Sequence, residues 1–379
     1  MHHRSFGKLD WQVSALGFGC MRLPTTDSAP VSANVAEAEA IRMIRYALDN
    51  GVNYVDSAYV YHAGKSEVVL GKALRDGYRD KVKVATKAPL MLIKTGEDYD
   101  KILDEQLKRL GIDMIDFYLF HGLGKSSWAK VKSQNLIGRA EAALKAGKIG
   151  HIGFSFHDRY DVFEEILNGY DGWSMCQIQY NFMDTDNQAG TKGLKLAASR
   201  GTSVVIMEPL LGGKLANPPQ EIRKLLHDSG YAGSTVDLAF RWLWDQPEVS
   251  VVLSGMSTME QVVANVQLAN RSGIGSLSGT ETDLIEKIRH FYKERTAIPC
   301  TNCGYCMPCP NAVDIPRNLK LYNDGAMYGS FNEPKRIYHL FLQPEQRAEN
   351  CIQCKACEEK CPQKIPISEW LLKVQEKFK

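Results

Sequence analysis

The chain has 379 residues, of which 44% are hydrophobic and 24% charged, as in ordinary globular proteins, and this length predicts two or at most three domains. Lysine and arginine total 46 against 44 acidic residues, which excludes a strongly basic surface for nucleic acid and an acidic tail. No apolar run reaches the roughly 18 residues of a membrane span, and the first residues lack a signal-peptide pattern. We therefore expect a cytoplasmic protein with neither a membrane nor a nucleic-acid partner.

Short apolar runs alternate with amphipathic stretches through the first three quarters of the chain. Continuous apolar runs are typical of strands buried on both faces of a parallel sheet. The amphipathic stretches predict helices, for example over residues 38–50, 98–110 and 137–147, and several of them end at a glycine, which relieves a left-handed C-terminal turn. The eight predicted strands are residues 13–18, 53–56, 82–86, 115–120, 151–155, 176–180, 202–207 and 249–253.

Eight strands alternating with helices over about 270 residues predict a (β/α)8 barrel, an α/β fold, over residues 1–297. A doubly wound open sheet is the alternative. It would usually carry a G-x-G-x-x-G turn after the first strand, and here Gly17-Phe18-Gly19-Cys20 stops at G-x-G. The barrel is the better interpretation.

The composition changes at residue 298, after a predicted helix over 281–295, and residues 298–379 carry eight of the ten cysteines. They form two motifs, C-x2-C-x2-C-x2-C-P and C-x2-C-x2-C-x3-C-P. Three cysteines at every third position and a fourth before proline are the bacterial ferredoxin pattern, in which the fourth cysteine binds the other cluster. This predicts two 4Fe–4S clusters held by Cys300, Cys303, Cys306, Cys309, Cys351, Cys354, Cys357 and Cys361.

The first cysteine motif is one residue shorter before Cys309 than the ferredoxin pattern. Zinc is the alternative occupant, but a zinc ion needs only four thiolates and leaves the spacing of three unexplained. The 41 residues between Cys309 and Cys351 contain helix-compatible stretches at 317–323 and 336–341. The tail thus resembles the mainly α-helical dicluster ferredoxin domains that are fused to oxidoreductases, and this resemblance implies single-electron transfer and a redox partner protein.

Four polar residues follow consecutive predicted strands. Asp56 ends the second strand with Tyr61 five residues later, Lys87 follows the third, and His121 the fourth. Each of these residues alone also has an ordinary structural explanation. Asp56 could cap a helix, and Tyr61 could be a core aromatic. Lys87 could be a surface charge, and His121 could be a histidine whose hydrogen bonds are made within the barrel end. Because a barrel places reactive groups at the carboxyl ends of its strands, the set together indicates a catalytic site.

The chemistry that these four residues suit is proton transfer to a carbonyl. An ammonium beside a phenol lowers the phenol pKa, and a paired carboxylate keeps the ammonium charged and oriented. A histidine beside the carbonyl can hydrogen-bond to its oxygen. The residues therefore predict hydride delivery to the carbonyl carbon, with Tyr61 protonating the oxygen.

Further motifs follow in order along the barrel: LGFGCMR at 16–22, DSA at 56–58, GKSE at 64–67, TK at 86–87, YLFH at 118–121, GFS at 153–155, QIQYN at 177–181 and PLLGG at 209–213. In this order and spacing the chain resembles the aldo-keto reductase family over residues 1–297, and with its tail the iron–sulfur branch of that family. The resemblance implies a catalytic tetrad of Asp56, Tyr61, Lys87 and His121. It also implies NAD(P)H-dependent reduction of an aldehyde or ketone, or oxidation of the alcohol.

The resemblance implies cofactor contacts as well. Ser155 and Gln177 would hold the nicotinamide carboxamide, and the loop after residue 255 would face the adenosine phosphates. The remaining contacts that it implies are Pro209, Leu210, Gly212, Ser257, Gln261 and Asn265.

Two departures from the family pattern concern the cofactor. Phe156 stands where much of the family has asparagine, and Gly255, Gln261 and Ala264 stand where NADPH-preferring members often have Lys, Arg and Glu. An arginine pairs with a 2′-phosphate and a glutamine does not, so either NADP or NAD is expected.

The tail raises a question of electron counting. Nicotinamide transfers two electrons as hydride and a cubane cluster transfers one, so exchange between them normally needs a flavin, for which the sequence has no independent motif. The clusters would then exchange electrons with a partner or act as structural supports. The alternative function is a redox-sensing or electron-transfer subunit that binds nucleotide without significant carbonyl turnover; the complete tetrad argues against it.

Overall fold

The computed structural model describes residues 1–29 and 31–379 of the chain. They form two compact units. The first contains Met1–Ala216 and Ser234–Ser278, and the second contains Asn217–Gly233 and Gly279–Lys379. The second unit thus includes the helix that precedes residue 298, and the domain boundary between residues 297 and 298 stays a prediction.

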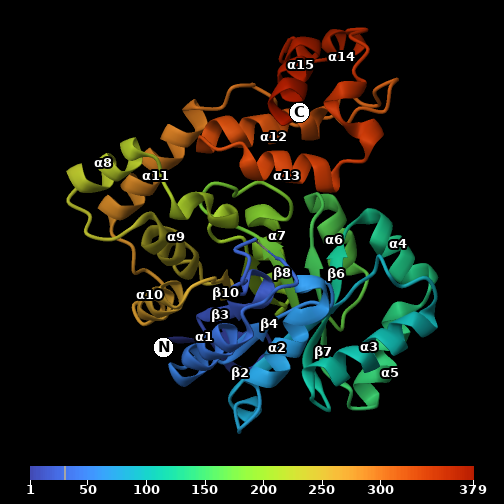
Figure 1. Ribbon diagram of the computed structural model, residues 1–379, viewed down its shortest axis with the longest axis vertical. Helices are drawn as coiled ribbons and strands as arrows, with labels where there is room; N and C mark the ends of the chain where they lie inside the picture. Colours follow the sequence, from blue (N-terminus) through green and yellow to red (C-terminus); the bar gives the residue numbers. More distant parts are fainter. Residues whose placement is uncertain (30) are drawn as a thin grey trace. The chain divides into compact units, whose positions relative to one another are not determined.

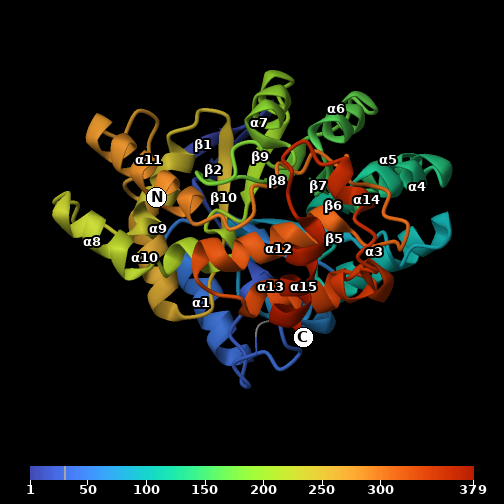
Figure 2. The same cartoon turned by 90° about the horizontal axis from the view of Figure 1, so that it is seen from above.

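The first unit is a closed barrel of eight parallel strands, in the order β10-β3-β4-β5-β6-β7-β8-β9, surrounded by helices (Figures 1 and 2). Each barrel strand overlaps one of the eight predicted apolar runs, so the predicted fold class is confirmed. The strands are β3 (Leu16–Gly19), β4 (Tyr54–Asp56), β5 (Lys83–Ala88), β6 (Ile115–Leu123), β7 (Ile149–Phe156), β8 (Met175–Gln179), β9 (Ser203–Met207) and β10 (Val249–Gly255).

The helices of the barrel unit bury their apolar faces against the strands, as their amphipathic patterns predict. At the end of α3, Gly111 has φ 64° and donates its N–H to the Leu107 carbonyl, which is the glycine cap expected there. The helices are α1 (Glu37–Asp49), α2 (Lys65–Ala73), α3 (Gly96–Leu110), α4 (Lys125–Ser133), α5 (Leu136–Lys145), α6 (Tyr160–Asn168), α7 (Gly190–Ser199), α9 (Thr235–Trp244) and α10 (Met259–Ala269).

An N-terminal hairpin closes the amino end of the barrel. It consists of β1 (His3–Phe6) and β2 (Leu9–Ser14), which pair antiparallel. Phe6 and Val13 are fully buried among side chains inside the barrel, and the Phe6 ring centroid lies 5.0 Å from that of Phe117. The predicted first strand over 13–18 was therefore wrong at its start. Because Val13 is buried by the hairpin, one apolar run continues from β2 into β3.

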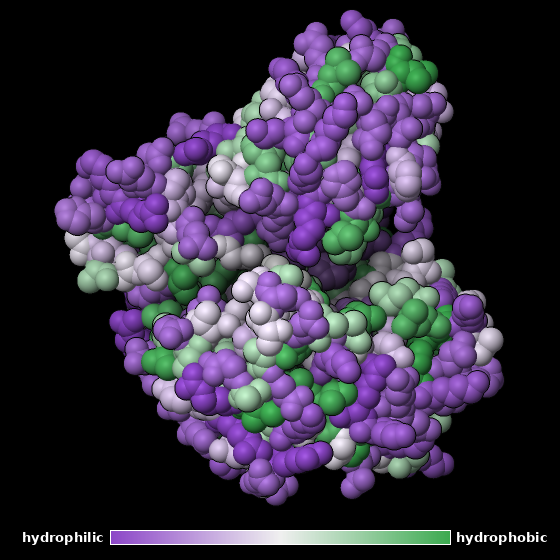
Figure 3. All heavy atoms as spheres, viewed as in Figure 1, coloured by the Kyte–Doolittle hydropathy of each residue, from purple (hydrophilic) through white to green (hydrophobic). Residues whose placement is uncertain are grey.

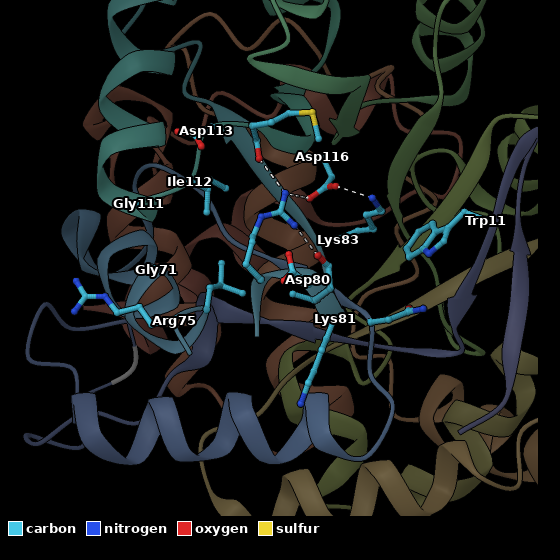
Figure 4. Close-up of a pocket in the computed structure, with 15 residues that line it drawn as sticks. Trp11, Gly71, Arg75, Asp80, Lys81, Lys83, Gly111, Ile112, Asp113 and Asp116 are labelled. Atoms are coloured by element: carbon cyan, nitrogen blue, oxygen red, sulfur yellow. Dashed lines mark hydrogen bonds and ion pairs between the residues drawn. The ribbon is translucent and has the colours of Figure 1, made fainter. Parts of the chain in front are cut away.

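A buried carboxylate joins two barrel strands at this same end. The Asp116 side chain is only 3% exposed, and its oxygens lie 2.7 Å from Arg79 Nη2 and 3.0 Å from Lys83 Nζ. One oxygen also accepts the Val84 N–H at 2.9 Å. Asp116, Arg79 and Lys83 line the pocket in Figure 4, as does Trp11. The cluster links β5 to β6 at the end of the barrel opposite the predicted site.

We expect Asp116→Ala to lower the free energy of unfolding by about 2–4 kcal/mol, because it leaves Arg79 and Lys83 without their carboxylate. The matched control is Glu165→Ala, which removes an exposed ion pair with Lys132 and should cost less than about 1 kcal/mol. Urea unfolding of both variants measures the difference. Equal losses would contradict the stabilising role of Asp116.

The second unit is helical and has its own apolar core, which includes Ile298, Leu319, Leu371 and Phe378. The helix-compatible stretches predicted at 317–323 and 336–341 lie within α12 and α13, which confirms them. The helices of this unit are α8 (Gln220–Asp228), α11 (Gly279–Glu294), α12 (Ile315–Tyr328), α13 (Asn332–Phe341), α14 (Ala356–Glu359) and α15 (Ile367–Phe378).

Hydrophilic residues cover most of the surface seen in Figure 3, and apolar residues are exposed there in small groups. Large exposed apolar side chains occur in both units, for example Met91 and Leu92 in the first and Tyr305 and Ile352 in the second. Within the part of the chain that is described, no helix is both long and apolar enough to cross a membrane.

Candidate active site

The predicted tetrad converges at the carboxyl ends of neighbouring strands. Asp56 is the last residue of β4, Lys87 lies in β5 and His121 in β6, and these strands pair in register around the barrel. Tyr61 begins the short turn η2 (Tyr61–Gly64) that follows β4. The barrel therefore brings all four side chains to one end.

The Lys87 ammonium is the centre of this group. Its side chain is 1% exposed, and Nζ lies 2.5 Å from Asp56 Oδ1, 2.7 Å from the Ser57 carbonyl oxygen and 3.4 Å from the Tyr61 hydroxyl oxygen. An ammonium has three hydrogens to donate, and these three acceptors match them. Because the Tyr61 oxygen accepts from Lys87, the Tyr61 hydrogen is free to point toward a ligand.

Burial controls the charges of the group. Burial raises the pKa of Tyr61. The Lys87 ammonium lowers it, as expected of a cation beside a phenol, but burial is the larger effect and the net pKa is raised. Burial lowers the pKa of Lys87, but Asp56 and Tyr61 together outweigh it and the pKa of Lys87 is raised. At neutral pH Tyr61 therefore keeps its proton and Lys87 its charge.

His121 is an uncharged member of the group. Its ring lies edge-on to Tyr61, with centroids 6.0 Å apart and an interplanar angle of 83°. Burial, with smaller effects of Lys87 and His157, lowers the pKa of His121 to about 3. Nδ1 is buried and has no hydrogen-bond partner among the described residues. His121 can therefore hydrogen-bond to a ligand as a neutral imidazole.

A strained turn fixes the position of Tyr61. His62, Ala63 and Gly64, which follow it, all have positive φ, of 51°, 51° and 88°. The His62 side chain is fully buried, and its Nδ1 lies 2.6 Å from the Ser32 carbonyl oxygen. This contact ties the Tyr61 turn to the loop after β3. Sequence reasoning missed it, because nothing in the local pattern pairs His62 with Ser32.

Gln177 lies beside Asp56, across the interior of the barrel. Its Nε2 is 2.5 Å from Asp56 Oδ2, and its Oε1 is buried without a partner among the described residues. Ser155 is the register partner of Gln177 on β7, and its hydroxyl accepts the Gly122 N–H at 2.8 Å. The two predicted carboxamide contacts are thus neighbours. The Gln177–Asp56 bond was not predicted.

The other predicted cofactor residues lie in the loops that follow β9 and β10. Pro209, Leu210 and Gly212 are at the start of the loop after β9, where Gly212 has φ 67°. Ser257 donates its N–H to Gln261 Oε1 at 2.8 Å where α10 begins. Asn265 on α10 donates to the Ser254 hydroxyl at 3.1 Å.

The structure shows the surroundings of Phe156 and Gly255, two residues that depart from the family pattern. Phe156 is fully buried, and its ring packs against Phe163 at 5.1 Å between centroids, so it contributes no polar contact. A Cβ added to Gly255 would lie 2.8 Å from Arg22 Cγ. The Arg22 side chain therefore occupies the space beside Gly255 that a larger residue would need.

The tail cysteines gather in the second unit. Cys300, Cys303, Cys306 and Cys361 line one pocket there. Burial raises the pKa of Cys351, and the neighbouring Cys309 and Cys354 raise it further, so these thiols also lie close together. In residues 1–29 and 31–379, no three His, Cys, Asp or Glu side chains converge tightly enough to hold a single metal ion. Cys20 and Cys176 are free and fully buried.

Comparison with known proteins gives the class to which the chain belongs. The aldo/keto reductase family matches residues 15–288, and a 4Fe-4S dicluster domain matches residues 299–365. Because the first match covers more than half of the chain, the protein belongs to the aldo/keto reductase family, a family of oxidoreductases, as its motifs predicted.

Relatives that are similar in sequence include the following two proteins. A probable aldo-keto reductase 1 of Glycine max is 34% identical over 157 residues, which are 39% of this chain and 43% of the soybean protein. The uncharacterized oxidoreductase YqkF of Bacillus subtilis (strain 168) is 25% identical over 300 residues, which are 71% of this chain and 92% of that protein.

Solved structures of aldo-keto reductases share the fold. The holo form of an aldo-keto reductase from Bacillus halodurans has a TM-score of 0.62 and 28% identity, and the match covers 76% of this chain and 96% of that one. An aldo-keto reductase from Klebsiella pneumoniae in complex with NADPH has a TM-score of 0.60 and 22% identity, with the same coverage. At 22% identity this likeness supports the fold alone.

We expect His121 to stay neutral from about pH 8 down to about pH 5, because its pKa is lowered to about 3. NMR of protein labelled in its nine histidines can follow the ring shifts, and a His121→Gln variant assigns the His121 signal. A His121 titration near the ordinary histidine pKa of about 6.5 would contradict the effect of burial.

Proposed function

We propose that the barrel reduces an aldehyde or ketone with a nicotinamide cofactor, or oxidises the corresponding alcohol. The observation that carries this proposal is the buried Lys87 ammonium, whose three acceptors are Asp56, the Ser57 carbonyl and the Tyr61 hydroxyl. The bound cofactor would supply the hydride. The residues of this chain supply the proton and the charge stabilisation.

The residues present fit a nicotinamide. Its carboxamide has an N–H2 donor and a carbonyl acceptor. Gln177 offers a buried, unpartnered acceptor in Oε1, and the Ser155 hydroxyl, which already accepts from Gly122, can donate its hydrogen. This pair of groups supports carboxamide binding even though Phe156 adds no polar contact.

In this proposal Tyr61 is the general acid. Lys87 donates to the phenol oxygen, and the phenol hydrogen then faces the carbonyl oxygen of the substrate. Negative charge that develops on the substrate oxygen is stabilised by the Tyr61 hydroxyl and by the ammonium behind it. Asp56 stabilises that ammonium. The neutral His121 would hold the same substrate oxygen by a hydrogen bond and so fix the direction of hydride attack.

The choice between NADP and NAD depends on the adenosine end of the cofactor. The Klebsiella pneumoniae aldo-keto reductase, which shares the fold, is in complex with NADPH. Neither Gly255 nor Gln261 offers a cation to a 2′-phosphate. NADH therefore fits the same groups, and we propose that the site accepts either cofactor.

We further propose that the tail holds two 4Fe–4S clusters, one on Cys300, Cys303, Cys306 and Cys361 and the other on the remaining four tail cysteines. The common pocket of the first four cysteines supports this division, as does the ferredoxin pattern, in which the cysteine before proline binds the other cluster. When bound, the clusters would supply one-electron transfer, to a redox partner protein, or structural support.

A second candidate function is a redox-sensing or electron-transfer subunit that binds nucleotide without carbonyl turnover. The observation that favours it is the match of residues 299–365 to a 4Fe-4S dicluster domain. The two functions differ in their need for Tyr61: carbonyl reduction needs its hydroxyl as the acid, whereas nucleotide binding alone does not.

We expect Tyr61→Phe to lower kcat for carbonyl reduction by about 10²–10⁴-fold, because it removes the general acid, and to change the Kd of NADPH by less than about twofold. Steady-state kinetics with an aromatic aldehyde and a fluorescence titration measure these two effects. Tyr59→Phe is the matched control, because it removes the hydroxyl that donates to the exposed Glu105 side chain and keeps the ring that Arg109 covers. Unchanged turnover in Tyr61→Phe would favour the second function.

We expect Cys361→Ser to lower the iron content by about half, because each cluster needs four thiolates. If the proposed division is correct, adding Cys306→Ser removes no more iron, whereas adding Cys309→Ser removes most of the rest. Cys176→Ser, a buried cysteine of the barrel unit, is the control and should leave the iron unchanged. Iron and visible absorbance are measured on anaerobic protein. Full iron in Cys361→Ser would contradict its role as a ligand.

A further inference from the structure

In the side-chain amide of Gln177, both N–H donors form hydrogen bonds and the carbonyl oxygen does not. Gln177 is fully buried, and its Nε2 donates to Asp56 Oδ2 at 2.5 Å and to the Tyr54 hydroxyl oxygen at 3.3 Å. Tyr54 directs its own hydrogen to Met175 Sδ at 3.8 Å, so the Tyr54 oxygen is an acceptor for Gln177. Both N–H groups of the amide are therefore used, while Oε1 has no partner among the described residues.

The direction of this amide follows from chemistry. An ionised carboxylate can only accept hydrogen bonds, so the atom that faces Asp56 must be the amide nitrogen. Oε1 then points away from Asp56. A buried carbonyl without a donor costs free energy, and such groups are rare in folded proteins. The unpartnered Oε1 therefore indicates a ligand that brings an N–H or O–H donor.

Asp56 is held from both sides. Its Oδ1 accepts from Lys87 and its Oδ2 from Gln177, each at 2.5 Å. Lys87 in turn reaches the Tyr61 hydroxyl at 3.4 Å. One line of hydrogen bonds thus runs from the free carbonyl of Gln177, through Asp56 and Lys87, to the oxygen of Tyr61.

We propose that Gln177 is a positioning residue that couples a bound cofactor to this line. The inference rests on the proposed function, because the donor that reaches Oε1 is then the carboxamide N–H of the nicotinamide. A hydrogen bond accepted at Oε1 polarises the amide and strengthens the bond that Nε2 donates to Asp56. The coupling is reciprocal, so the Asp56 charge strengthens the hydrogen bond that Gln177 Oε1 accepts from the carboxamide.

The test compares two cofactors that differ at the carboxamide. NADP⁺ carries the N–H2 donor, and its 3-acetylpyridine analogue carries a methyl group in that place. Their Kd values are measured by quenching of tryptophan fluorescence. In the parent protein we expect NADP⁺ to bind about tenfold more tightly than the analogue. In Gln177→Met, which has similar length and no acceptor oxygen, we expect the two Kd values to agree within about twofold.

The coupling itself is tested in Asp56→Asn. Removing the charge should lower the preference for NADP⁺ from about tenfold to about threefold. A purely structural loss would weaken both cofactors equally and leave their ratio unchanged. Tyr54→Phe is the matched control. It removes the longer contact of Gln177 and the hydrogen bond from Tyr54 to Met175, and it keeps the ring and the bond from Gln177 to Asp56, so the ratio should stay at its parent value.

A second variant provides the test if Gln177→Met does not fold. Gln177→Glu keeps the shape of the side chain. When the introduced carboxyl group and Asp56 share a proton, the introduced group can donate to Asp56 and still present an acceptor. We therefore expect the NADP⁺ preference of Gln177→Glu to approach the parent value near about pH 6. It should fall toward about pH 8.5, because two ionised carboxylates repel each other and the introduced group then has no hydrogen to donate to Asp56.

The outcomes separate this proposal from the proposed function. A tenfold preference that persists in Gln177→Met or in Asp56→Asn would overturn the coupling. Equal binding of NADP⁺ and its analogue by the parent protein would overturn it too, while leaving nicotinamide binding intact. Binding of neither compound by the parent would overturn the proposed function as well.

Discussion

The buried charge of Lys87 is the constraint on which the active end of the barrel depends. Moving an ammonium out of water costs several kcal/mol unless well-placed partners replace its hydration. Here the partners are the Asp56 carboxylate, the Ser57 carbonyl and the Tyr61 hydroxyl. Two of them belong to β4 and the residue after it, and the third to the next turn. The pairing of β4 with β5 and the strained turn after Tyr61 are therefore what keep the charge in place.

The barrel and the tail differ in the number of electrons that they would transfer. The proposed hydride transfer would move two electrons, whereas each 4Fe–4S cluster would move one. The tail cysteines also have a structural role, because Cys361 belongs to the apolar core of the second unit and Cys300, Cys306 and Cys357 pack against it. In the proposal of two bound clusters, cluster binding and folding of this unit would therefore be coupled.

The sequence predicted the barrel because strands buried on both faces are apolar throughout and are separated by amphipathic helices. The same signal failed at Val13, since a residue buried by the hairpin is indistinguishable from the start of a buried strand. The order of the strands was enough to bring Asp56, Lys87 and His121 to one end. The protonation state of Tyr61 was not predictable from the sequence, because its pKa depends on burial, which outweighs the effect of the nearby ammonium.

The bond between Gln177 and Asp56 shows why contacts inside a barrel escape sequence reasoning. The two residues are 121 positions apart, on strands β8 and β4 that do not pair with each other. Strand spacing predicts which side chains share an end of the barrel. It does not predict which of them meet across the interior, because that depends on the stagger of the strands.

A single turnover under anaerobic conditions tests the central claim most directly. The protein is mixed with NADPH that carries deuterium at both hydrogens of nicotinamide C4 and with an aromatic aldehyde, and the alcohol is analysed by mass spectrometry and NMR. If hydride passes from the cofactor to the carbonyl carbon while Tyr61 protonates the oxygen, the alcohol carbon carries one deuterium. An alcohol whose carbon carries only solvent hydrogen, or the absence of any alcohol, would contradict this account.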